Sequence, residues 1–375
     1  MAGIYIHVPF CRQACRYCDF YFTVSLKYRD AYVDALLREL ENRADEVSGS
    51  LISTVYLGGG TPSVLSHQHL EKIMTRVKEL YEIDTAAEVT IEANPDDLDD
   101  ARLRILKTNG INRLSIGVQS FHSTHLERMR RSHLAEEAVD AIQRSAAHGF
   151  DNINMDLIYG LPGLKNTEWH QDLETTMDLP VQHISAYHLT YEPGTVFSHW
   201  KKKGKIRELP EENSIEQYNM LREVTSTHGF EHYEISNFAL PGFRSKHNSS
   251  YWSGTMYVGF GPSAHSFNGK ERRWNFASLK AYIENSAAGL SGFEKELLTS
   301  RDRYHDYLIT ALRTKEGADL GMIRDQFGKL VADRLTVKTV PFTASGEIVM
   351  EGDELRMTPQ GWLRSDLVLQ ALMEE

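Results

Sequence analysis

Residues 7–20, HVPFCRQACRYCDF, contain all three cysteines of this 375-residue chain and decide how the rest of the sequence is interpreted. Cys11, Cys15 and Cys18 follow the pattern Cys-x3-Cys-x2-Cys and come directly after residues 4–8, which we predict to be a β-strand. Three thiols on one polar loop favour a soft-metal site, either zinc or an iron–sulfur cluster. Zinc would need a fourth ligand, with His7 the nearest, and a disulfide framework would leave one thiol unpaired.

The strand before the cysteines is the first of six short runs rich in β-branched and aromatic residues. The other five predicted strands are residues 54–57, 88–92, 113–118, 152–158 and 183–189. Turns and helical patterns, such as residues 28–47 and 135–148, separate these runs, which is typical of βα units with a parallel sheet. We therefore predict an α/β fold whose first part is a partial (β/α)6 TIM-type barrel, open on one side. The cysteine loop would lie at the C-terminal ends of the strands, where barrel active sites gather.

The alternation of strands and helices stops near residue 200. Residues 211–228 indicate a helix, and residues 238–276 form an aromatic, glycine-rich segment. We expect a barrel in residues 1–200, an extension in 201–298 and a small C-terminal domain in 299–375. The last part combines predicted helices with a hairpin near Gly346 and Gly352, which suits a mixed α+β, winged-helix-like domain.

Composition narrows the classes of function. The formal charge of −11 and the pI near 5.8 disfavour a nucleic-acid-binding protein, which needs a basic surface. No apolar run is long enough for a membrane span, and the N-terminus does not resemble a signal peptide. We therefore expect a cytoplasmic protein with reduced thiols. The one basic run, residues 201–205, leaves open a peripheral contact with a membrane surface.

The cysteine pattern, with Tyr17 before the last cysteine, resembles the signature of the radical S-adenosylmethionine (SAM) superfamily. A cubane held by three cysteines has one iron without a protein ligand. The resemblance implies that Cys11, Cys15 and Cys18 hold a [4Fe–4S] cluster whose free iron binds SAM.

Polar or glycine residues stand at the ends of the later strands. They are Gly59, Gly60 and Thr61 in GGGTPS, Glu92 in TIEANPD and Gln119 in SIGVQSF, while Asp156 in NINMDLIYGLPG lies within the fifth strand and Arg131 follows a helix. Glycines let a backbone approach a ligand, and a carboxylate accepts hydrogen bonds from hydroxyl or amino groups. Because parallel strand ends share one edge, we expect these groups to surround the cysteine loop.

Together with HNSSYW, these motifs resemble the oxygen-independent coproporphyrinogen III dehydrogenase family over nearly the whole chain. The resemblance implies a radical SAM barrel and assigns SAM contacts to nine positions. These positions are Tyr5, Tyr17, Gly59, Gly60, Thr61, Glu92, Gln119, Arg131 and Asp156.

Two departures distinguish branches of that family. The dehydrogenases continue with Cys-x-Cys, whereas Phe20 occupies the position of the fourth cysteine here, and they have a longer segment before the cluster. Both features resemble the HemW-type haem chaperone branch, which implies binding of haem and its delivery to respiratory haem proteins. The alternative is oxidative decarboxylation of coproporphyrinogen III, so enzymatic activity stays open. For haem we expect contacts from His247, Tyr251 and Trp252, with His265 as a rival iron ligand.

Overall fold

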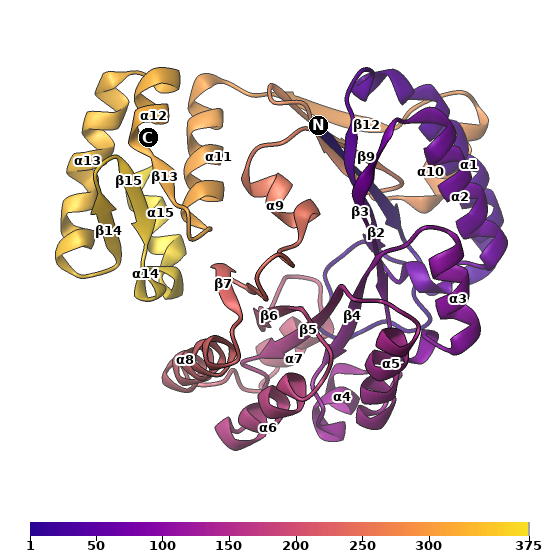
Figure 1. Ribbon diagram of the computed structural model, residues 1–375, viewed down its shortest axis with the longest axis horizontal. Coiled ribbons are helices and arrows are strands. Elements are labelled where there is room, and N and C mark those ends of the chain that lie inside the picture. The colour runs from indigo at the N-terminus through magenta and orange to yellow at the C-terminus, as the bar shows by residue number, and fades with distance from the viewer. Residues whose placement is uncertain (374–375) are drawn as a thin grey trace.

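The computed structural model describes residues Met1–Met373. Figure 1 shows a large twisted sheet covered by helices on its outer side, with a small module containing α11–α15 beside it. The sheet positions the cysteine loop and the predicted site residues.

The six predicted strands form the parallel centre of the sheet. They are β1 (Ala2–Val8), β2 (Ile52–Gly59), β3 (Ile83–Ala93), β4 (Arg113–Gln119), β5 (Ile153–Tyr159) and β6 (His183–His188). Each pairs in parallel with the next, in chain order. The predicted α/β partial barrel is thus confirmed, with several strands longer than expected.

Short strands extend both edges of this parallel centre. Within Met1–Met373 the sheet has 12 strands in the order β12-β11-β10-β9-β1-β2-β3-β4-β5-β6-β8-β7. The added strands are β7 (Glu231–Glu234), β8 (Asn237–Ala239), β9 (Tyr257–Phe260), β10 (His265–Phe267), β11 (Glu271–Asn275) and β12 (Phe293–Leu297). Sequence analysis missed them because each has three to five residues, a length at which glycine turns obscure the alternating pattern.

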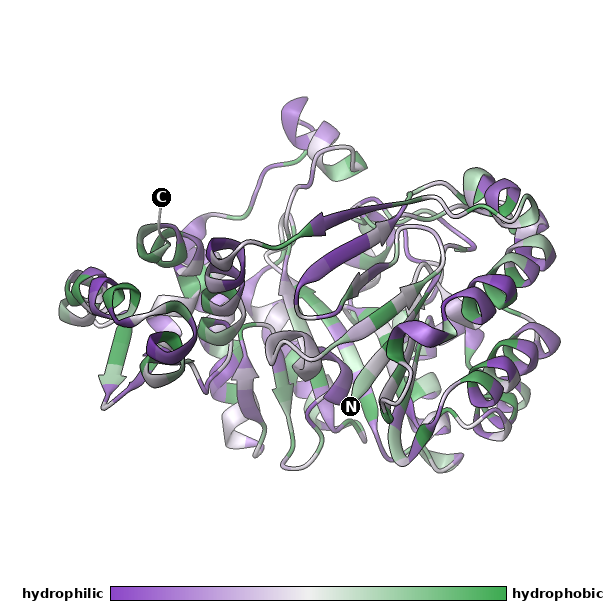
Figure 2. Ribbon diagram, turned by 90° about the horizontal axis from the view of Figure 1, so that it is seen from above, coloured by the Kyte–Doolittle hydropathy of each residue, from purple (hydrophilic) through white to green (hydrophobic). Residues whose placement is uncertain are grey.

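Most helices of this part of the chain cover the outer face of the sheet, whereas α9 (Lys246–Trp252) lies on the concave side. The other helices are α1 (Arg29–Asn42), α2 (His67–Leu80), α3 (Asp100–Thr108), α4 (Ser123–Met129), α5 (Ala135–Ala147), α6 (Asn166–Met177), α7 (Val196–Lys202), α8 (Glu211–Thr227) and α10 (Leu279–Ala287). The long helix expected at residues 28–47 is instead α1 flanked by 3-10 turns. Figure 2 shows hydrophobic residues on the strands and mixed hydrophobic and hydrophilic sides on the surrounding helices.

Alternation along the strands separates an apolar face from a polar face. In β1, Ile4, Ile6 and Val8 are fully buried in the core that also includes side chains of the outer helices. Tyr5 points to the opposite, concave face. Its register partner on the neighbouring strand β2 is Tyr56, which lies on the same face. The concave face carries polar residues from the central strands, such as Thr54, Ser115 and Asn154, so it differs in chemistry from the apolar core on the other face.

The C-terminal module has its own hydrophobic core, which includes Leu308, Ile323, Leu355 and Trp362. Its elements are α11 (Ser300–Leu312), β13 (Ala318–Asp319), α12 (Leu320–Phe327), α13 (Lys329–Ala344), β14 (Ile348–Glu351), β15 (Glu354–Met357), α14 (Pro359–Leu363) and α15 (Ser365–Leu372).

Sequence analysis predicted the β14–β15 hairpin but missed α13, whose β-branched residues and internal Pro341 weaken the helical signal. The last two helices, α14 and α15, are separated at Arg364. The division of the chain at residues 200 and 298 stays a prediction. No helix within Met1–Met373 has the length and apolar content of a membrane span.

Candidate functional site

The cysteine loop leaves β1 and is fastened to three neighbouring segments. At its base, Cys11 N donates to Thr23 O (3.0 Å) and Thr23 N donates to Pro9 O (2.7 Å). Near its middle, Arg16 N donates to Met129 O at the end of α4, and Phe197 N of α7 donates to Arg16 O. The Arg16 guanidinium also lies over the Trp200 ring. These contacts hold the loop at the C-terminal ends of the strands, as predicted.

All three cysteines are free thiols of intermediate burial. Thr61 Oγ1 donates to Cys11 Sγ and Arg131 Nη1 donates to Cys15 Sγ, both at 3.5 Å. Burial, with the neighbouring Cys15 and Cys11, raises the pKa of the Cys18 thiol to about 12. The Cys18 thiolate therefore needs a nearby positive charge, which the irons of a cluster would supply.

The donor set fits a cubane cluster. Within Met1–Met373 no three His, Cys, Asp or Glu side chains converge on the position of one metal ion. A cubane does not require that convergence, because each of its cysteine ligands binds a different iron. Donors from Thr61 and Arg131 would also stabilise the cluster's sulfur ligands.

The glycine segment after β2 packs directly against the cysteine loop. Gly60 N donates to Val8 O and Thr61 N donates to Phe10 O. A Cβ atom at Gly60 would lie 2.8 Å from both of those carbonyl oxygens, and Gly59 has φ +105° with the His7 ring beside it. The first role of these glycines is therefore close contact between two loops, which brings Thr61 to Cys11.

Glu92 and Asp156 are two carboxyl groups on the concave face. Glu92 accepts hydrogen bonds from Tyr56 Oη (2.9 Å) and Gly59 N (3.0 Å). Burial, and then the charge of Asp156, raises the pKa of Glu92 to about 7. Asp156 accepts from Asn154 Nδ2 (2.7 Å), and burial raises its pKa as well. Two neighbouring acids with raised pKa values are suited to a cationic ligand.

Gln119 and Arg131 meet above Gly117. A Cβ atom at Gly117 would lie 2.9 Å from Gln119 Nε2 and 3.2 Å from Arg131 Nη2, so both side chains occupy the space that the glycine leaves. Arg131 is anchored by donating to Asn94 Oδ1 and Gly117 O, both at 2.6 Å. Gln119 has φ +72°, a left-handed conformation rare for a residue with a side chain. Strain of this kind is common at functional sites.

The two tyrosines assigned to SAM lie beside the cysteine loop. Tyr5 Oη hydrogen-bonds His7 Nδ1 (3.1 Å), next to the cysteine loop. Burial raises the pKa of Tyr17 above its usual value, Cys15 and Cys18 raise it further, and Arg131 opposes both effects. The structure thus brings together side chains from β1 to β5 that lie more than a hundred residues apart in sequence.

The HNSSYW motif forms α9 on the concave side of the sheet. His247 is 1% exposed, and both of its ring nitrogens are occupied. Nδ1 pairs with Thr54 Oγ1 and Nε2 with Tyr251 Oη, each at 2.8 Å. The ring also stacks on Tyr56 at 5.0 Å. Direct binding of haem iron by His247 would require that one of these hydrogen bonds break.

Trp252, at the end of α9, is partly exposed and faces the C-terminal module. The Arg313 guanidinium lies over its ring at 4.9 Å. Its indole Nε1 is buried and has no hydrogen-bond partner within the described residues. Trp252 therefore contacts a different part of the molecule from His247 and Tyr251.

Sequence analysis did not identify Tyr56, Ser115 or Asn154, which orient the two acids. Tyr56 holds Glu92, while Asn154 and Ser115 hydrogen-bond Asp156. The period-2 pattern of the strands carried the signal, because Tyr56 alternates with the buried Val55 and Leu57. Register was also needed, since it places Ser115 opposite Glu92.

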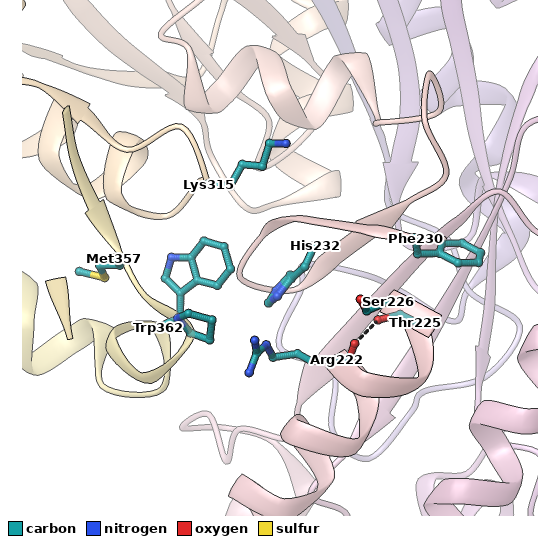
Figure 3. A pocket seen from close by; sticks show the side chains of 9 residues that line it. Arg222, Thr225, Ser226, Phe230, His232, Lys315, Met357 and Trp362 are labelled. Atoms are coloured by element: carbon teal, nitrogen blue, oxygen red, sulfur yellow. Dashed lines mark hydrogen bonds between the residues drawn. The ribbon is translucent and has the colours of Figure 1, made fainter. Parts of the chain in front are cut away.

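A separate cavity of about 330 Å³ lies where α8 and β7 meet the C-terminal module. Figure 3 shows Arg222 of α8, His232 of β7 and Trp362 of α14 around it. His232 stacks on Phe238 at 4.1 Å and meets the edge of Trp362 at 4.5 Å. None of the predicted site residues lines this cavity.

Two family models match the chain. Residues 5–176 match the radical SAM superfamily, and residues 298–364 match the HemN C-terminal domain. Membership of the radical SAM superfamily implies a [4Fe–4S] cluster and SAM. The fold is similar to that of coproporphyrinogen III oxidase (HemN) from Escherichia coli, with a TM-score of 0.87 and 24% identity, over 99% of this chain and 90% of the other. At that identity the likeness shows the fold alone.

Curated relatives named heme chaperone HemW match most of the chain. The Bacillus subtilis protein is 34% identical and covers 100% of both sequences. The Synechocystis protein is 40% identical over 70% of this chain and 65% of its own length. The Escherichia coli protein is 35% identical over 70% of this chain and 69% of its own length. This chain therefore belongs to the HemW family of haem chaperones within the radical SAM superfamily.

Proposed function

We propose that this protein binds a [4Fe–4S] cluster, SAM and haem, and delivers the haem to respiratory haem proteins. One observation carries the proposal: the three free cysteines lie at the strand ends of the face that also carries Glu92 and Asp156, two acids whose pKa values are raised. That arrangement provides soft ligands for a cluster beside two carboxyl groups that can bind a cationic molecule.

In this proposal Cys11, Cys15 and Cys18 hold the cluster. When bound, the cluster supplies an iron that can chelate the amino and carboxylate groups of SAM. The SAM contacts are assigned to Tyr5, Tyr17, Gly59, Gly60, Thr61, Glu92, Gln119, Arg131 and Asp156. Glu92 and Asp156 accept hydrogen bonds from SAM, while Arg131 holds the cluster loop through Cys15.

His247 and Tyr251 are assigned a supporting role beside the haem rather than iron ligation, because the His247 ring is buried and doubly hydrogen-bonded. Trp252 is assigned a contact with the C-terminal module through Arg313. The exposed lysines of residues 201–205, which begin at the end of α7, are the segment we assign to contact with an anionic membrane surface.

The test compares haem transfer with porphyrinogen oxidation. Anaerobically reconstituted protein is first examined for the visible absorbance and paramagnetic signal of a reduced cluster, then titrated with haem and monitored at the Soret band. The same holoprotein is incubated with SAM, reductant and coproporphyrinogen III. We expect haem uptake, transfer to an apo-haem protein, and no divinyl product. Product formation without haem uptake would show instead that the chain is a dehydrogenase.

A further inference from the structure

The extension of the sheet beyond β1 carries an aromatic wall on its concave face. Tyr257 is the register partner of Gly3, and Phe267 is the partner of Tyr257. His265 and Trp274 are partners in the next strand pair. Since register partners share a face, Tyr257, Phe267, His265 and Trp274 lie on the same face of the sheet as Tyr5. We call these four residues the β10 wall.

The β10 wall borders both the cysteine loop and α9. His265 lies two strands from β1, which corresponds to about 10 Å at the usual strand spacing. Its charge acts on His7, the residue that hydrogen-bonds Tyr5 Oη. Tyr251 of α9 meets the edge of Tyr257 at 4.6 Å. The wall is therefore continuous with the concave face that carries the predicted SAM contacts.

His265 differs from His247 in the state of its imidazole. Its ring is exposed, stacks on Trp274 at 6.0 Å with 24° between planes, and has no hydrogen-bond partner within Met1–Met373. Partial burial, together with the positive charge of Arg272, lowers its pKa. A neutral imidazole with a free nitrogen is a ready ligand for haem iron, and a stacked indole provides a flat apolar surface.

We propose that haem docks on the β10 wall, with His265 as the axial ligand of its iron. The proposal rests on the proposed function, because haem is taken as the cargo. Trp274 and Phe267 contact the porphyrin face, and Tyr251 closes the side nearest α9. His265 Nε2 or Nδ1 donates its lone pair to iron, with no change in oxidation state and no covalent bond to the porphyrin.

Charges around the wall agree with a transferable haem. Arg272, next to the wall, is already paired with Asp306 and lies 4.0 Å from Glu296. Glu294 accepts from Trp274 Nε1. Arg272 is therefore engaged by these carboxylates, and we place the haem propionates in solvent. One imidazole and an open aromatic face hold haem less firmly than a closed pocket does.

The test is a haem titration of the reconstituted holoprotein with the variants His265→Ala and His265→Gln. We expect haem affinity to fall by at least about tenfold, as for loss of groups that support a metal. We also expect the Soret maximum to move and the imidazole-ligated ferric signal to disappear, with recovery of that signal on adding free imidazole. Cluster content and SAM affinity should not change.

His199→Ala is the matched control. His199, on α7, is also exposed and without a hydrogen bond from its ring within the described residues, but it has no aromatic wall beside it. We expect this variant to bind haem like the unmodified protein. Unchanged haem affinity and spectrum in both His265 variants would overturn the proposed ligand, although haem binding itself would stand. Absence of haem binding by the unmodified holoprotein would instead overturn the proposed function.

Discussion

Replacing His247 by alanine separates a structural role from iron ligation. The substitution removes two buried hydrogen bonds and leaves Thr54 Oγ1 and Tyr251 Oη without partners. Each lost bond costs about 1 kcal/mol, and the vacated ring space adds a cavity penalty. The expected loss of stability is therefore about 2 to 4 kcal/mol. At about 2 °C for each kcal/mol in a chain of this size, Tm should fall by about 4 to 8 °C.

The assay is thermal unfolding followed by circular dichroism, with haem titration of the folded variant at low temperature. Tyr251→Phe is the control, because it removes one hydrogen bond and keeps the ring, so its Tm should fall by only about 2 °C. The haem spectrum of His247→Ala should match that of the unmodified protein. A Tm change below about 1 °C, together with loss of the haem spectrum, would refute the reasoning and return iron ligation to His247.

Three further predictions concern the cluster, the acids and the junction with the C-terminal module. Cys15→Ser should lose the visible absorbance of the cluster while its circular dichroism stays native, because the loop adds little to the barrel core; a globally unfolded variant would contradict this. The pKa of Glu92 is raised to about 7, so the carboxyl group is mostly ionised at pH 8 and mostly protonated at pH 6. SAM affinity, measured by calorimetry, should therefore fall about tenfold from pH 8 to pH 6. Glu92→Gln should bind SAM weakly at both pH values. If this variant kept the pH dependence of the unmodified protein, Glu92 would not be the group whose ionisation controls SAM affinity. Burial lowers the pKa of His232 to about 4, below its unfolded value near 6.5, so its contribution to stability is complete above pH 6.5 and is lost as pH falls toward 4. His232→Phe should flatten the decrease in Tm between pH 7 and pH 5, and an unchanged slope would assign the acid sensitivity to other groups.

Most of the central fold could be predicted from the sequence, because its signals are local. The six parallel strands alternate or run apolar over six or more residues, and each is followed by a turn and a helix. The edge strands β9–β12 could not be predicted in this way. Each is short, and each is stabilised by pairing with a partner strand rather than by its own pattern.

Within the site, the same contrast holds between features with a local sequence signal and features that depend on strand register. Glu92 was identified from its position at a strand end and Asp156 from its position within the fifth strand. Their partners Tyr56, Ser115 and Asn154 were not, because a hydrogen bond across the sheet depends on register. The glycines after β2 were expected to make room for a ligand. In the folded chain they make room for the cysteine loop.

What the sequence by itself determined is the predicted cluster site, because its three cysteines lie within eight residues and their spacing is independent of the rest of the fold. Tertiary structure alone decided which of two histidines keeps an exposed imidazole. His247 and His265 are both surrounded by aromatic residues in the sequence. Contacts with β2 and within α9 bury the first and occupy both of its nitrogens, while the pairing of β9 with β1 and with β10 places the second at an exposed position of the sheet extension. Long-range strand pairing and register set the exposure and hydrogen bonding of a side chain, and neither can be read from its neighbours in the chain.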